Sequence, residues 1–61
     1  MMDLKEAVNL ARKAANDTGA THYAIWVKTS QGFGYYYVTN AADYRPTVNS
    51  NIEEIVYPKE K

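Results

Sequence analysis

The 61-residue sequence contains no cysteine and only one histidine, so the usual means of holding a metal ion are missing. Thiolates are absent, and a single imidazole cannot complete the common zinc ligand sets. Disulfides are excluded for the same reason, which leaves packing and association as the means of stabilising so short a chain. We therefore expect neither a metal nor a cofactor.

Charge of one sign and long apolar runs are also absent. Seven basic residues balance seven acidic ones, whereas a nucleic-acid-binding domain is typically strongly basic and a nucleic-acid mimic strongly acidic. No apolar run approaches the ~20 residues of a membrane-spanning helix. The N-terminal residues lack the basic start and apolar core of a signal peptide. We expect a cytoplasmic protein with no membrane partner.

Candidates for catalysis are few. His22 is the one candidate base, and neither Ser30 nor Ser50 lies in the sequence context of an activated nucleophile. Glu53 and Glu54 are adjacent, so on a strand their side chains point to opposite faces, which is poor geometry for shared acid–base work. We interpret His22 as a half-exposed residue at the start of a strand and the acidic pair as protection of an edge strand. We expect no catalytic residues and no enzyme.

The length of the chain predicts a single domain over residues 1–61. A domain of this size buries only about 60% of its unfolded surface, so its stability is expected to be marginal. Oligomerisation is a common support for so small a core. We therefore expect a homodimer.

The clearest local pattern predicts an amphipathic helix over residues 4–17. Its apolar positions recur at spacings of three and four, which places them on one helix face. Asp3 is a good N-cap with Glu6 three residues later, and Gly19 suits the left-handed position that ends a helix. The apolar face is mostly alanine, so its packing partner must supply the large side chains.

Strands are predicted at residues 21–29, 33–40 and 52–57, where aromatic and β-branched residues are frequent. Residues 41–51 are rich in Asn, Asp, Ser and Pro and are expected to form a loop, with one short helical turn near its start. A helix is the alternative for the third segment, because Glu53-Glu54 favours it. The resulting prediction is an α+β domain in which an N-terminal helix packs on a two- to three-stranded antiparallel β-meander, in the order α-β-β-β.

Six of the eight aromatic residues fall in the predicted hairpin between residues 23 and 37. A two-residue turn at Gln31-Gly32 pairs Val27 with Tyr36 and Trp26 with Tyr37, although a turn one residue longer would change these pairs. With the shorter turn, one face is the floor for the helix and the other is uncovered. The floor comprises Tyr23, Ile25, Val27, Tyr36 and Val38. The uncovered face comprises His22, Ala24, Trp26, Lys28, Phe33, Tyr35 and Tyr37.

The uncovered aromatic residues are where we expect function. Tyr and Trp are enriched at interface hot spots, because they combine a large apolar area with a polar group. The sequence therefore favours a small protein-binding module, of the kind that phages and mobile elements use as stoichiometric inhibitors or adaptors, which masks a surface of another protein. The predicted contact residues are Trp26, Phe33, Tyr35 and Tyr37, with Lys28 and Arg45 as charged neighbours.

Other uses of the same residues stay open. The face can be the contact of a homodimer, or the third strand and the loop before it can fold back over part of it. Cross-strand aromatic pairs stabilise a sheet without any partner. Exposed aromatic residues can also stack the bases of single-stranded nucleic acid, which is the alternative function. In that case Lys28 and His22 would supply the cations beside Trp26, Tyr35 and Tyr37.

Overall fold

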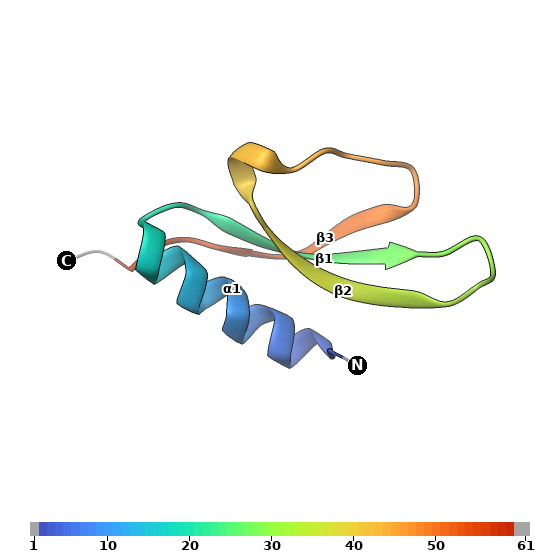
Figure 1. Cartoon of the computed structure of the whole chain (residues 1–61), viewed down its shortest axis with the longest axis horizontal. Helices are drawn as coiled ribbons and strands as arrows, with labels where there is room; N and C mark the ends of the chain where they lie inside the picture. The colour runs from blue at the N-terminus through green and yellow to red at the C-terminus, as the bar shows by residue number, and fades with distance from the viewer. Residues whose placement is uncertain (1, 60–61) are drawn as a thin grey trace.

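The computed structural model describes residues 2–59 and contains one helix followed by three strands (Figure 1). The elements are α1 (Leu4–Thr18), β1 (His22–Lys28), β2 (Gly34–Asn40), the 3-10 turn η1 (Ala41–Asp43) and β3 (Ser50–Val56). The predicted α+β class and element order are confirmed, and the third segment is a strand rather than a helix. It begins at Ser50, inside the predicted loop.

Local interactions define both ends of α1. The Asp3 carboxylate accepts a hydrogen bond from the Glu6 N–H at 2.8 Å, as an N-cap does. At the other end, Gly19 has φ 73° and its N–H donates to the Ala15 carbonyl, which is the left-handed cap expected from glycine. Within residues 2–59, no helix is both long and apolar enough to cross a membrane.

The three strands form one antiparallel sheet in the order β2-β1-β3. The predicted meander is therefore wrong in its strand order, because a meander keeps strands that are consecutive in the chain next to each other. Pairing on both edges suits β1, which holds the fully buried Ala24 and Ile25. Because β2 and β3 are both antiparallel to β1, they run in the same direction. Residues 41–49 must therefore travel back along the sheet between them.

The turn between β1 and β2 is one residue longer than the two-residue turn predicted from the sequence. Thr29 N–H donates to the Phe33 carbonyl at 2.6 Å, and Gly32 N–H donates to the Thr29 carbonyl at 3.1 Å. The loop thus consists of Ser30, Gln31 and Gly32. Gly32 has φ 87°, the left-handed conformation that a three-residue hairpin loop requires at this position.

This additional loop residue changes which β1 side chains share a sheet face with the side chains of β2. The observed register pairs Trp26 with Tyr36, whereas the prediction paired Trp26 with Tyr37. Directly opposite residues share a face, so the predicted faces are wrong for β1, whose alternate residues are exchanged between the two sides, and right for β2. The side that faces α1 carries His22, Ala24, Trp26, Tyr36 and Val38, and the other side carries Tyr23, Ile25, Val27, Phe33, Tyr35 and Tyr37.

The core lies between α1 and the first of these sides. Ala11 and Ala15 are fully buried against Val56, and Val8 and Val38 pack around them. Alanine on the helix lets its axis approach the sheet closely, while the strands supply the larger side chains. The predicted alanine-faced packing surface of α1 is confirmed, although the floor beneath it differs from the predicted one.

Residues 41–49 form a third layer over part of the opposite sheet face. Figure 1 shows this segment, in orange, on the far side of the sheet from α1. It starts with η1, which confirms the expected short helical turn, and it ends at the beginning of β3. We call residues 41–49 the crossover segment. The fold thus has a helix, a sheet and an irregular segment stacked in that order.

Candidate functional site

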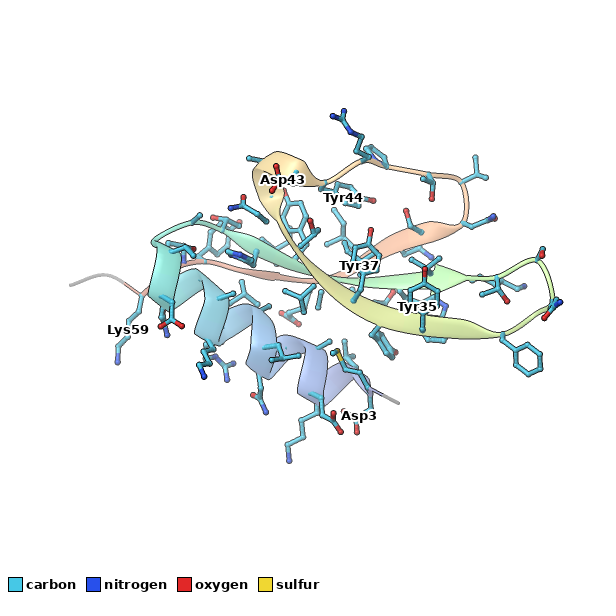
Figure 2. All side chains as sticks on the ribbon, in the orientation of Figure 1. Asp3, Tyr35, Tyr37, Asp43, Tyr44 and Lys59 are labelled. Atoms are coloured by element: carbon cyan, nitrogen blue, oxygen red, sulfur yellow. The ribbon has the colours of Figure 1, made fainter. Side chains whose placement is uncertain are left out.

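Three aromatic side chains form a row on the sheet face opposite α1. Phe33, Tyr35 and Tyr37 occupy alternate positions of an extended chain, so their side chains point to one face, and we call them the aromatic row. The Tyr35 and Tyr37 ring centroids are 6.3 Å apart, and Figure 2 shows both rings on the side of the crossover segment. Phe33 is 70% exposed and Tyr35 47% exposed, while Tyr37 is half-buried. The row is largely open to a partner.

Aliphatic side chains extend this surface across the sheet. Val27 is paired with Tyr35 in the register, and Ile52 and Ile55 are paired with β1 residues of the same face. Both isoleucines are about two-fifths exposed (39% and 43%). We call the aromatic row together with Val27, Ile52 and Ile55 the open face.

Sequence reasoning did not identify the two isoleucines as part of this surface. Ile52 and Ile55 are three positions apart, so strict alternation would place them on opposite faces. A β-bulge in β3 at Glu53-Glu54, opposite Ala24, adds one residue and returns both to the same face. The three-residue spacing of the isoleucines around an acidic pair was the available signal, and it is informative only if a bulge is expected there.

Trp26 belongs to the other side of the sheet, which corrects its predicted grouping with Tyr35 and Tyr37. It pairs with Tyr36 in the register, and the two ring centroids lie 4.7 Å apart. The indole ring also extends over Gly34, where a Cβ atom would come within 2.7 Å of Trp26 Cε2 and still closer to Cζ2 and Cη2. Trp26 is thus a packing residue on the side that faces α1.

The cationic residues proposed from the sequence are divided between different parts of the fold. Lys28 is exposed, but its register position opposite Gly34 places it on the α1 side, away from the aromatic row. Arg45 is exposed on the crossover segment. His22 is 7% exposed rather than half-exposed, and its Nδ1 lies 2.9 Å from the Ala20 carbonyl oxygen. That carbonyl can only accept, so Nδ1 carries the proton.

The crossover segment is held over the remaining part of the face by contacts at both ends. The Asn40 side chain accepts from the Ala42 N–H at 2.9 Å, which fixes the start of η1. Tyr44 packs edge-on against Tyr23, with ring centroids 5.5 Å apart and planes at 85°. At the far end, Ser50 Oγ lies 3.1 Å from Thr47 Oγ1. Tyr23 is therefore covered from within the chain, while the aromatic row is not.

The chemistry available on the open face is apolar and aromatic. None of the six residues that define the open face carries a charge. Residues 2–59 also enclose no cavity and bring together no group of three or more His, Asp or Glu side chains. Such a surface can bind another molecule by contact and burial, and the phenolic hydroxyls of Tyr35 and Tyr37 can donate hydrogen bonds at its edge.

Comparison of the chain with protein families, with characterised proteins and with solved structures finds no match to any of them.

Proposed function

We propose that this protein is a small, non-enzymatic binding module that masks a surface of another protein with its open face. The observation that carries the proposal is the aromatic row, in which Phe33, directly before β2, is 70% exposed and Tyr35, within β2, is 47% exposed. Rigid aromatic side chains lose little conformational entropy on binding and bury a large area, so they serve well as interface anchors. The mode of action is that of a stoichiometric inhibitor or adaptor, working in the cytoplasm.

The charge distribution favours a protein partner over nucleic acid. Binding to nucleic acid depends on cations that neutralise phosphates. The cations predicted from the sequence could not neutralise phosphates bound at the open face, since Lys28 and His22 occupy the α1 side of the sheet. Arg45 is the exposed cation of the crossover segment. Stacking on the aromatic row alone would leave the phosphates of a strand without neighbouring charge.

The test compares capture of partners by variants of the open face. The variant Phe33→Ala/Tyr35→Ala removes most of the exposed area of the aromatic row. The control Tyr57→Ala removes a ring outside the row that is 70% exposed, as Phe33 is. We expect immobilised wild-type protein and the Tyr57 variant to retain the same cellular protein, and the double variant to lose it. Retention of that protein by all three would refute the proposal.

Salt dependence distinguishes the alternative function. A single-stranded nucleic-acid complex should weaken steeply with ionic strength, whereas an apolar protein interface should weaken little. If oligonucleotides bind tightly, with strong salt dependence and only when Tyr35 is present, the partner is single-stranded nucleic acid and the proposed protein partner is wrong.

We also infer that the working form is a homodimer. Six apolar residues make up the buried core of the described chain, and only one of them, Ile25, is large and wholly enclosed. A core of this size provides little stability, and association is one of the few means left to a chain without disulfides or metals.

A further inference from the structure

The two edges of the sheet differ in their protection against pairing with another strand. The outer strand β3 contains a bulge and the adjacent charges Glu53 and Glu54, which are two of the devices that block edge-to-edge association. The outer strand β2, Gly34–Asn40, contains no charged residue, no proline and no register shift against β1. One edge is thus guarded and the other is a regular, uncharged template.

The register identifies the backbone groups that β2 presents outward. Thr29 N–H donates to the Phe33 carbonyl, and at the other end of the hairpin Ala41 N–H donates to the Thr21 carbonyl. Both bonds join odd-numbered residues, and hydrogen-bonded positions alternate along an antiparallel ladder. Odd-numbered β2 residues therefore direct their N–H and C=O groups to β1, and even-numbered ones direct theirs to the free edge. For Tyr36 and Val38, the structure records no hydrogen bond to these outward groups from residues 2–59. The outward carbonyl of Asn40, at the end of the strand, accepts from the Thr39 hydroxyl at 3.3 Å.

We propose that β2 pairs with β2 of a second copy of this chain, antiparallel and centred on Tyr37, to form a continuous six-stranded sheet. This register aligns all of Gly34–Asn40 with its copy. It also sets Tyr36 opposite Val38 of the partner subunit, so that outward groups meet outward groups. In this register each even-numbered residue of β2 lies opposite an even-numbered residue of its copy, as interchain hydrogen bonding requires. Full overlap gives about eight interchain hydrogen bonds, within the range of about 10 ± 5 in typical protein interfaces.

The side chains at this edge suit a copy of themselves. The twofold axis is perpendicular to the sheet, so each side chain meets residues of the same sheet face. Tyr37 faces Tyr37 of the partner subunit in a non-hydrogen-bonded pair, where Cα atoms are only about 4.5 Å apart and rings can stack. Because β2 contains no charged residue, no like charges of the two paired strands oppose one another across the axis. The two aromatic rows join into one longer surface.

This inference deepens the proposed homodimer, and it is tested by changing single backbone amides in the synthetic full-length chain. N-methylation of Val38 removes an outward donor of β2 without altering any side chain. The matched control is N-methylation of Ile55, whose N–H points to the outer edge of β3. Sedimentation is measured between about 10 µM and about 1 mM, a range that covers weak and moderate association, with circular dichroism as the check of folding.

We expect the unmodified chain and the Ile55 control to reach twice the 6.9 kDa chain mass. The Val38-methylated chain should dissociate at least about tenfold more readily, because symmetry removes the bond twice. A chain that is monomeric throughout, or a dimer indifferent to the Val38 change, would overturn the proposal.

Amide hydrogen exchange of the unmodified chain provides an answer even if the Val38-methylated chain does not fold. We expect the Tyr36 and Val38 amides to exchange about tenfold more slowly at the highest concentration than at the lowest. Exchange that does not depend on concentration would overturn the edge assignment.

Capture of a foreign protein by the open face is a separate readout. A dimer that captures nothing would refute the docking proposal alone, and a monomer that captures a partner would refute the edge proposal alone.

Discussion

Substituting Gly34 by alanine tests the hairpin register through the sign of a stability change. Gly34 lies in β2 with no left-handed backbone requirement, since the positive φ values of the described chain occur at Gly19 and Gly32. Alanine is therefore allowed by the backbone. What opposes it is the Trp26 ring, whose Cε2 atom would lie 2.7 Å from the new Cβ, with two further ring atoms closer.

The size of the effect follows from two opposed contributions. Replacing glycine by alanine inside a strand stabilises by roughly 0.5–1 kcal/mol, because the unfolded chain loses freedom. Forcing a methyl group into occupied space costs about 1–3 kcal/mol. The indole is rigid and already packed at 4.7 Å from Tyr36, so the upper part of that range applies. We expect a net loss of about 2 kcal/mol, which lowers Tm by about 8–16 °C in a domain of this size.

Thermal and urea unfolding of four chains measure this effect: the wild type, Gly34→Ala, Trp26→Ala and the double variant. In the Trp26→Ala background the new methyl group meets no ring, so Gly34→Ala should become neutral or stabilising. The coupling free energy between the two positions should then be about 2–3 kcal/mol, at the upper end for residues in direct contact. Gly32→Ala is the comparison for a glycine with open space around it and φ 87°.

The opposite result would refute the register. With the two-residue turn, Trp26 is paired with Tyr37 and its ring does not lie over Gly34. Gly34→Ala would then raise the stability, and the cycle with Trp26→Ala would show no coupling. A stabilised Gly34→Ala variant would therefore restore the sequence-based division of the two faces.

Three further changes probe the layers separately, each by thermal unfolding. Ala11→Leu should destabilise by about 1–3 kcal/mol, because a fully buried alanine has no space beside it; unchanged stability would mean that α1 does not pack closely on the sheet. Asp3→Ala should cost about 1 kcal/mol through loss of the 2.8 Å bond to the Glu6 N–H, and Asp3→Asn should retain most of it. Tyr44→Ala should remove an edge-on ring contact with Tyr23 worth about 0.5–1.5 kcal/mol beyond burial. Amide exchange at Tyr23 should become faster in this variant but not in Tyr44→Phe. Equal exchange in both variants would show that the crossover segment is held by other contacts.

The helix was predictable because all its signals are local. The N-cap at Asp3, the stop at Gly19 and the alanine stripe each depend on residues within a few positions of one another, and the structure confirms them. The existence of three strands was predictable from composition in the same way. The short turn at the start of the predicted loop was also within reach, since it depends on Asn40 and the two alanines after it.

The composition of the candidate site depended on a choice that the sequence leaves open. Gly32 can serve a two-residue or a three-residue turn, because its left-handed conformation is useful in both. The difference of one residue exchanges Trp26 for Val27 on the face that carries Tyr35 and Tyr37. It also removes Lys28 from that face and moves Tyr23 and Ile25 away from the helix, while Tyr36 stays on the helix side as predicted.

The sequence by itself determined the helix with its alanine surface, the strands and the concentration of aromatic residues in one hairpin. Only the tertiary structure decided which aromatic residues stay exposed, where β3 pairs and what the crossover segment covers. The physical reason is that strand pairing is non-local and its side chains alternate with a period of two. A single residue in a turn or a bulge therefore reassigns a whole strand to the opposite face. Phe33, Tyr35 and Tyr37 remain open on this account, while Trp26 is packed on the side that faces α1.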